Sequence, residues 1–200
     1  KNQPVKFIIH AEEKSYDHIN LFRKSIKQNP SPIHYKNFQK TENRGTFLNL
    51  KNICIATPDV GGSKRASTYA KYLDCPMVIC NKTRKRANEV DSMDVIGDVK
   101  DMDVVLVDDM VDTAGTITKA ADLIKSKGAR SVRALASHCI MSGPADERVE
   151  NSQLEEMVFT DSIPYAGTSK KVKQLSVDAL FAETIRRVLD NESISSQYLI

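Results

Sequence analysis

No apolar run in this 200-residue sequence is long enough to cross a bilayer. Its start, KNQPVKFIIH, also lacks the longer apolar core and the small-residue cleavage site of a secretion signal. Basic and acidic residues nearly balance, at 29 and 26, so the net charge of +3 gives no support for a nucleic acid as partner. We therefore expect a cytoplasmic protein that binds neither membrane nor nucleic acid.

The four cysteines show no closely paired spacing such as CxxC, so neither a zinc site nor a disulfide framework is expected. They lie inside aliphatic segments, which favours buried reduced thiols and a reducing compartment. The histidines show no metal-ligand spacing either, and His138, late in an aliphatic strand, is interpreted as a core residue. The cysteines are Cys54, Cys75, Cys80 and Cys139.

Hydrophobic residues make up 40% of the chain and charged residues 28%, which is enough apolar material for one packed domain with or without an appendage. From residue 52 onward, nearly continuous apolar runs alternate with helical periodicity, as is typical of a parallel sheet flanked by helices. We predict an α/β fold with a mostly parallel, five-stranded sheet. The expected strands are NICIATPD, PMVICNK, VVLVDD, VRALASHC and EEMVFTDSIP, the last ending at Pro164.

Three segments have the spacing of amphipathic helices. Residues 66–73 and 117–124 each carry apolar side chains at i, i+3, i+4 and i+7, which predicts two crossover helices packed on the sheet. Residues 177–189 predict a last amphipathic helix. Most of the first 49 residues are polar, broken by proline and short of core residues, so we predict an appendage of unknown role over 1–49 and one domain over 50–200.

Polar loops follow the predicted strands at the edge where parallel α/β sheets bind ligands. After the first strand, Asp59 precedes Gly61 and Gly62, which let a backbone approach an anion, and a helix then begins. A glycine-rich turn before a helix is common by itself, so it carries little weight alone. The third strand, however, also ends in carboxylates, small residues and a helix start. Two such loops at one edge predict two anionic groups bound side by side.

Asp108, Asp109 and Asp112 lie together at the end of the third strand. Neighbouring carboxylates repel one another and resist desolvation, so cations or hydrogen-bond donors are expected around them. The DTAGT loop lacks the lysine of a P-loop and the spacing of GxGxxG. Backbone N–H groups and the hydroxyls of Thr113 and Thr116 are therefore expected to hold a phosphate.

A basic segment, NKTRKRANEV, follows the second strand. Such charge runs are usually solvated loops. Its position at the carboxyl end of a strand favours instead a mobile arm that closes over a polyphosphate and neutralises the charge of phosphoryl transfer. Its basic residues are Lys82, Arg84, Lys85 and Arg86.

These motifs together resemble a known family. VVLVDDMVDTAGT is similar to the phosphoribosyl pyrophosphate-binding signature of the type I phosphoribosyltransferase fold. With PDVGGSKRA, NKTR, SHCIMSGPA and TDSIP in this order, residues 50–200 resemble the carboxyl-terminal half of ribose-phosphate diphosphokinases, also called phosphoribosyl pyrophosphate synthetases. The resemblance implies transfer of the diphosphoryl group of ATP to the 1-hydroxyl of ribose 5-phosphate, giving phosphoribosyl pyrophosphate, with Mg²⁺ as cofactor.

The resemblance also implies roles for single residues. Lys82 and Arg84 would be catalytic and stabilise the transferring group. Asp59, Asp108 and Asp109 would hold the metal, directly or through water. The ribose 5-phosphate site would comprise Asp108, Asp109, Asp112, Thr113, Ala114, Gly115 and Thr116, and the pyrophosphate loop Asp59, Val60, Gly61 and Gly62.

The amino-terminal half of such enzymes supplies much of the ATP site, and residues 1–49 do not resemble it. We therefore expect binding of ribose 5-phosphate or phosphoribosyl pyrophosphate, weak or no synthetase turnover by this chain alone, and a small homo-oligomer, a dimer. Two alternatives stay open. One is a nucleobase phosphoribosyltransferase, which would need a segment that covers the base as a hood. Ordinary enzymes of that kind lack the NKTR and SHCIMSGPA motifs that this sequence has. The other is a noncatalytic subunit associated with a synthetase.

Overall fold

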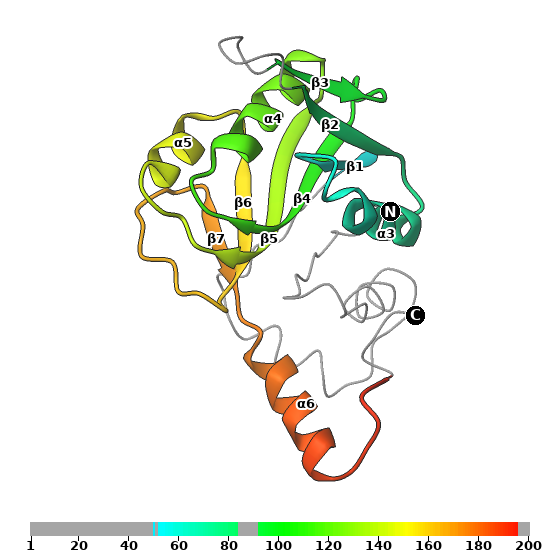
Figure 1. Ribbon diagram of the computed structural model, residues 1–200, viewed down its shortest axis with the longest axis vertical. Helices are drawn as coiled ribbons and strands as arrows, with labels where there is room; N and C mark the ends of the chain where they lie inside the picture. Colours follow the sequence, from blue (N-terminus) through cyan, green and yellow to red (C-terminus); the bar gives the residue numbers. More distant parts are fainter. Residues whose placement is uncertain (1–49, 51, 84–91, 196–200) are drawn as a thin grey trace.

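A seven-stranded sheet with helices on both faces makes up the part of the chain that this computed structural model describes, which is residue 50, residues 52–83 and residues 92–195 (Figure 1). The predicted appendage over 1–49 lies outside the described residues. The strand order is β3-β2-β1-β4-β5-β6-β7, and every neighbouring pair is parallel except β2 with β3. The strands are β1 (Ile53–Thr57), β2 (Met77–Thr83), β3 (Ser92–Ile96), β4 (Asp103–Val111), β5 (Ser131–Cys139), β6 (Glu156–Thr160) and β7 (Val172–Leu175).

The predicted α/β class and mostly parallel sheet are confirmed, but the expected number of five strands is wrong. β3 and β7 complete the sheet at its two edges. β3 alternates apolar with polar residues and β7 has only two apolar side chains, so neither contains the continuous apolar run of a buried parallel strand. β6 also ends at Thr160 rather than at Pro164, because Ser162 N turns back to donate to Thr160 Oγ1 at 3.3 Å.

The two predicted crossover helices are confirmed and cover opposite faces of the sheet. α3 packs Ala66 and Ala70 against one face, whereas α4 packs Ile117 and Ile124 into the larger core cluster on the other. A short helix, α5, joins that larger cluster through Val149 and was not predicted, because seven residues are too few to show a helical period. The helices are α3 (Ser63–Leu73), α4 (Gly115–Ser126), α5 (Ala145–Asn151) and α6 (Asp178–Leu189).

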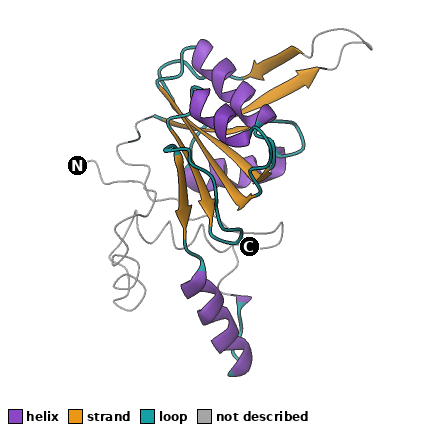
Figure 2. Ribbon diagram, turned by 90° about the vertical axis from the view of Figure 1, so that its left-hand side faces the viewer, coloured by secondary structure: helices purple, strands orange, loops and turns teal. Residues whose placement is uncertain are grey.

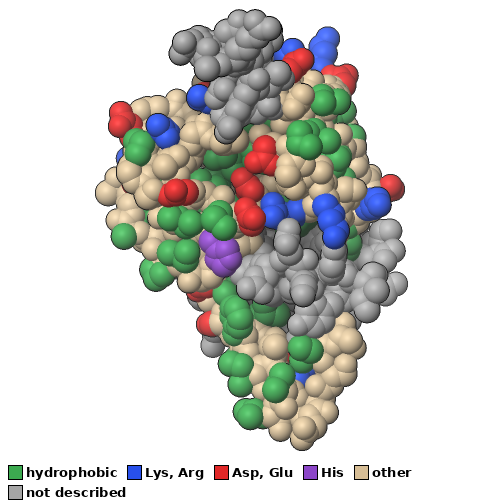
Figure 3. Space-filling view, in the orientation of Figure 1, with side chains coloured by type: hydrophobic (Ala, Val, Ile, Leu, Met, Phe, Trp, Pro, Cys, Tyr) green, Lys and Arg blue, Asp and Glu red, His purple; other side chains and the backbone are tan. Residues whose placement is uncertain are grey.

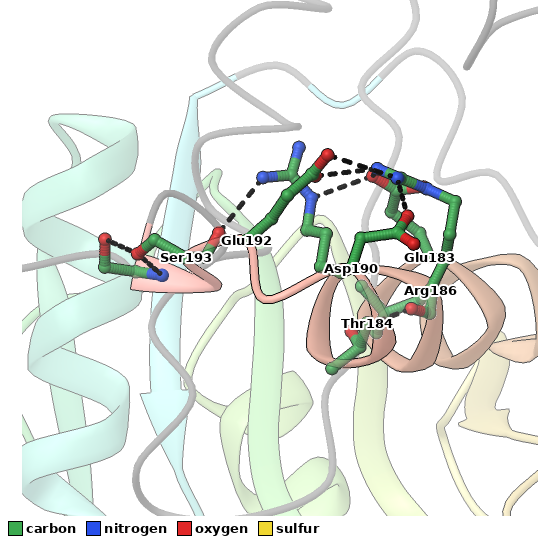
Figure 4. Close-up of polar contacts among 9 residues, drawn as sticks. Glu183, Thr184, Arg186, Asp190, Glu192 and Ser193 are labelled. Carbon is green, nitrogen blue, oxygen red and sulfur yellow. Dashed lines mark hydrogen bonds and ion pairs between the residues drawn. The ribbon is translucent and has the colours of Figure 1, made fainter.

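The predicted last helix forms as α6 but extends away from the sheet, as the two ribbon views show (Figures 1 and 2). None of its residues is buried. Its apolar stripe is exposed, with Leu189 at 75%. On its polar side Arg186 pairs with Glu183 at 3.1 Å, Asp190 at 2.7 Å and Glu192 at 3.0 Å (Figure 4). α6 is therefore held by local ion pairs rather than by packing on the domain.

None of the helices in the described part of the chain combines the length and the apolar composition that crossing a membrane requires.

Candidate functional site

The chain reverses its direction of travel across the sheet between β1 and β4. These two strands pair in parallel, with Ile55 opposite Val105, so their carboxyl ends lie side by side. From β1 the chain continues through α3 to β2, and from β4 it continues through α4 on the other face to β5. Such a point opens a crevice between the two loops, and α/β proteins bind ligands there. The two loops predicted to bind anions therefore meet at this position.

The first of these loops, residues 58–62, is closed by its own side chains. Thr57 Oγ1 donates to the backbone oxygen of Asp59 at 2.7 Å, and Gly62 N donates to Asp59 Oδ1 at 3.0 Å. A Cβ atom on Gly62 would overlap Thr57 Oγ1. The tight turn thus requires glycine at position 62, and one carboxylate oxygen of Asp59 is engaged within the turn.

The second loop, residues 112–116, leads into α4. Ala114 precedes the helix in the left-handed conformation with φ 59° and has no side-chain acceptor, so it gives the first N–H groups of α4 no cap. Asp112, Thr113 and Thr116 are exposed beside it. Uncapped N–H groups at a helix start favour an anion, and a phosphate fits the loop on this ground.

Residues that follow β5 brace this second loop. Ser142 Oγ donates to Asp112 Oδ1, and Ser142 N donates to Asp112 O at 3.0 Å. Arg148 Nη1, from α5, donates to Thr113 O at 2.9 Å. The sequence alone assigned Ser142 and Arg148 no role. Through Ser142 the SHCIMSGPA motif holds the loop in shape, and Arg148 of the following helix α5 adds a second contact.

β4 runs through the adjacent carboxylates and ends at Val111. Arg65 Nη1 lies 3.4 Å from Asp108 Oδ1, and Arg65 Nη2 lies 3.0 Å from Asp109 Oδ2. The expected cation beside the carboxylates is therefore present, and it is an arginine of α3. Figure 3 shows acidic side chains gathered on this face of the molecule with basic side chains next to them.

Sequence reasoning missed Arg65, although a signal existed. It is the third residue of α3, and cations are disfavoured at a helix N-terminus by the helix dipole. A basic residue in the first turn of a helix, where that turn has no acidic residue, suggests a partner outside the helix. That partner, Asp108, is 43 residues away in sequence, so only the fold identifies it.

The two carboxylates differ in their protonation. Burial, with a smaller contribution from Asp109, raises the pKa of Asp108 to about 7. Burial alone would raise the pKa of Asp109 as well, but the charge of Arg65 and the hydrogen bond with Asp108 hold it below its usual value. Asp109 is therefore charged at neutral pH, whereas Asp108 titrates near neutrality.

The carboxylate pair fits a magnesium ion that arrives with its ligand. In the described part of the chain, no three His, Cys, Asp or Glu side chains are grouped to hold a metal. Mg²⁺ prefers oxygen ligands, keeps several waters, and is commonly bound by one or two carboxylates together with substrate phosphates. Asp108 and Asp109 supply such oxygens and already share one cation, the Arg65 guanidinium.

The interpretation of His138 as a core residue is wrong. The side chain is only partly buried, and its Nδ1 lies 3.0 Å from Ser162 Oγ. His138 is opposite Met110, which is 47% exposed, whereas the next pair along the two strands, Val111 and Cys139, is buried at 3% and 1%. The face to which the side chain points, rather than its aliphatic neighbours in sequence, decides its exposure.

The basic segment is only partly described. Lys82 lies in β2, with its backbone opposite Met93 of β3. Arg84 and the rest of residues 84–91 lie outside the described residues. Roles for Lys82 and Arg84 therefore stay predictions.

The fold and the crevice define an α/β protein with two small-residue turns and a carboxylate pair at one edge of its sheet. Residues 78–199 match the family model described as the phosphoribosyl synthetase-associated domain. The chain therefore belongs to this family, and the resemblance noted from its motifs is confirmed at that level.

Relatives and a solved structure agree with this assignment. The ribose-phosphate pyrophosphokinase of Porphyromonas gingivalis is 64% identical over 149 residues, which is 74% of this chain and 48% of the relative. That of Helicobacter hepaticus is 48% identical over 166 residues, 83% of this chain and 52% of the relative. The phosphoribosylpyrophosphate synthetase of Mycobacterium smegmatis superposes with a TM-score of 0.65 at 33% identity, over 70% of this chain and 46% of that one. The chain thus spans about half the length of the curated relatives it matches.

Proposed function

We propose that this chain forms the ribose 5-phosphate-binding half of a ribose-phosphate pyrophosphokinase. Such an enzyme transfers the diphosphoryl group of ATP to the 1-hydroxyl of ribose 5-phosphate and releases phosphoribosyl pyrophosphate. One observation carries the proposal: two small-residue turns and a carboxylate pair meet where β1 and β4 lie side by side. A phosphorylated pentose needs donors at its phosphate and acceptors at its hydroxyls, and the crevice offers both.

The loop over 112–116 is proposed to bind the 5-phosphate. The N–H groups at the start of α4, including that of Gly115, and the hydroxyls of Thr113 and Thr116 would donate to its oxygens. Arg148 and Ser142 would keep the loop in this shape through the contacts described above. No lysine within the loop is required, because the helix dipole and the N–H groups favour the negative charge.

The carboxylates are proposed to orient the pentose. Asp109, which is charged at neutral pH, would accept from a ribose hydroxyl, and Asp108 would do so in its deprotonated state. Asp59, Asp108 and Asp109 would hold Mg²⁺, directly or through water, and the ion would supply charge neutralisation for the transferring diphosphoryl group. The turn formed by Asp59, Val60, Gly61 and Gly62 would hold the diphosphate of the product with its backbone N–H groups other than that of Gly62, which already donates to Asp59 Oδ1.

The transfer itself is proposed to use Lys82 and Arg84. Their cations would stabilise the charge that develops on the transferring group, since phosphoryl-type transfer depends mainly on positioning and charge neutralisation. We propose weak or no turnover by this chain alone and a dimer as its assembled form. Residues 50–200 form the domain in this proposal, and 1–49 an appendage of unknown role.

Titration calorimetry tests the proposal. The chain should bind ribose 5-phosphate more tightly than a nonhydrolysable ATP analogue, and Mg²⁺ should strengthen the sugar-phosphate binding. Asp109→Asn should weaken it by roughly tenfold, because a hydrogen bond to a charged group is worth about 1.5–3 kcal/mol.

Asp98→Asn is a matched control for Asp109→Asn. Asp98 lies between β3 and β4 at the opposite edge of the sheet, where its carboxylate accepts from Lys100 N at 2.9 Å. The substitution removes the same charge and should leave sugar-phosphate affinity unchanged. Absent ribose 5-phosphate binding, or equal losses in the two variants, would refute the proposed site.

A further inference from the structure

The guanidinium of Arg65 lies between the two parts of the proposed site. It reaches Asp108 at 3.4 Å and Asp109 at 3.0 Å on one side. On the other side, its Nη1 is 3.7 Å from the place a Cβ of Gly62 would occupy, at the proposed diphosphate turn. The side chain therefore occupies the middle of the crevice, where a ligand's cation would have to lie.

These ion pairs are only partly screened by water. The side chain of Arg65 is 25% exposed, that of Asp108 is 22% exposed and that of Asp109 is 50% exposed. Arg65 also stands in the first turn of α3, where the helix dipole disfavours a positive charge. Its attraction to the two carboxylates opposes this cost, and its positive charge offsets the repulsion between them.

A divalent cation bound to the same oxygens would repel the guanidinium. Two unit charges about 4 Å apart interact by about 1 kcal/mol in water and about 4 kcal/mol near a protein surface, and a double charge increases this. The metal ion and the Arg65 guanidinium therefore cannot pair with the same oxygens of Asp108 and Asp109 at the same time.

Resting on the function proposed above, we propose that Arg65 is a positioning residue that gives way to the metal. In the unliganded chain it holds Asp108 and Asp109 side by side, and the divalent cation that arrives with the sugar phosphate replaces it. Arg65 thereby weakens the binding of metal alone, so that the ion enters together with the phosphates that complete its coordination.

Binding of Mn²⁺ alone, followed through the electron paramagnetic resonance signal of the free ion, tests this. Arg65→Gln should bind Mn²⁺ roughly three- to tenfold more tightly than the native chain, in line with the usual strength of partly exposed ion pairs. Arg65→Lys keeps a cation near the carboxylates and should stay close to the native affinity. The gain should disappear when Asp109→Asn is added to Arg65→Gln.

Lys64→Gln is the matched control, because it removes the same charge from an exposed neighbour on α3. An unchanged or weakened Mn²⁺ affinity in Arg65→Gln would overturn the proposal, as would an equal gain in Lys64→Gln or a gain that survives Asp109→Asn. Circular dichroism checks folding of each variant. Should Arg65→Gln not fold, Arg65→Met takes its place: it removes the same charge, keeps an unbranched side chain and leaves both carboxylates intact, and the same gain is expected of it.

The two proposals fail in different ways. Loss of the proposed function would appear as absent ribose 5-phosphate binding by the native chain in calorimetry. Failure of the Arg65 proposal would appear as equal Mn²⁺ affinities of the native chain and Arg65→Gln, whether or not the sugar phosphate binds.

Discussion

Gly62 carries the tightest backbone constraint in the crevice. Its N–H group donates to Asp59 Oδ1 at 3.0 Å, and the hydroxyl of Thr57 occupies the space that a Cβ would need. That hydroxyl is fully buried and is itself bonded to the turn, so it has no room to move aside. The turn after β1 therefore keeps its shape only with glycine at position 62.

Gly62→Ala should lower the free energy of unfolding by about 1–3 kcal/mol, the usual cost of overpacking. Urea denaturation measures it. Gly115→Ala is the comparison, because the atom nearest to a Cβ there would be at the end of the Arg148 side chain, at 3.2 Å, which can move by a few tenths of an ångström. Its unfolding free energy should stay within about 1 kcal/mol of native, since alanine favours a helix by about that amount over glycine. Equal losses in both variants would contradict this account.

The sequence predicts the chemical type of each site residue, but it does not predict which residues lie next to it in the fold. Carboxylates at a strand end require a cation, and that expectation is met. The identity of the cation is not readable from the sequence, because Arg65 and Asp108 are 43 residues apart. The same holds for Arg148, which reaches the backbone of Thr113 from 35 residues away.

At the scale of elements, α6 shows how local ion pairs support a helix none of whose residues is buried. Glu183 accepts from Arg186 and from Arg187, the latter at 2.8 Å. These hydrogen bonds, that from Arg186 first, lower the pKa of Glu183 from 4.5 to about 2. Such pairs between residues three or four apart support an exposed helix.

The lowered pKa of Glu183 makes the stability of α6 depend on pH. Since the pKa of Glu183 is depressed in the folded state, its contribution to helix stability is full above about pH 4.5 and is lost as the pH falls through about 2. A carbon-13 NMR titration of the Glu183 carboxyl group should have its midpoint well below 4.5. Arg186→Gln should move that midpoint upward more than Arg187→Gln does. A native midpoint at the ordinary value would show that the network does not form in solution.

Periodicity predicted the elements that pack on the core. The central strands are covered on both faces, and the crossover helices α3 and α4 each pack one apolar face on the sheet, so all of them have apolar patterns. β3, β7 and α5 were missed since they are short or lie at an edge, where fewer positions need apolar side chains. Amphipathicity predicted α6 as a helix but not its position relative to the sheet.

At the scale of the whole molecule, stability rests on the sheet and not on α6. Phe159 of β6 is fully buried in the larger core cluster, whereas Phe181 of α6 is 47% exposed. The same residue type therefore occupies two opposite environments in one chain.

Phe159→Ala should destabilise the chain by about 3–5 kcal/mol, through lost burial and the cavity left behind. Phe181→Ala should change stability by less than about 1 kcal/mol, as exposed substitutions usually do. Thermal and urea unfolding measure both. A large loss in Phe181→Ala would mean that α6 packs against a partner in solution.

The sequence by itself determined the α/β class, the two crossover helices and the residue types at the strand ends, because burial between layers and turn chemistry are local demands on the chain. Only the tertiary structure decided that the two turns meet where β1 and β4 lie side by side, that Arg65 is the cation between Asp108 and Asp109, and that α6 leaves its apolar stripe exposed. The reason is physical: strand order and contacts over tens of residues depend on how the layers pack together, and no short stretch of sequence encodes them.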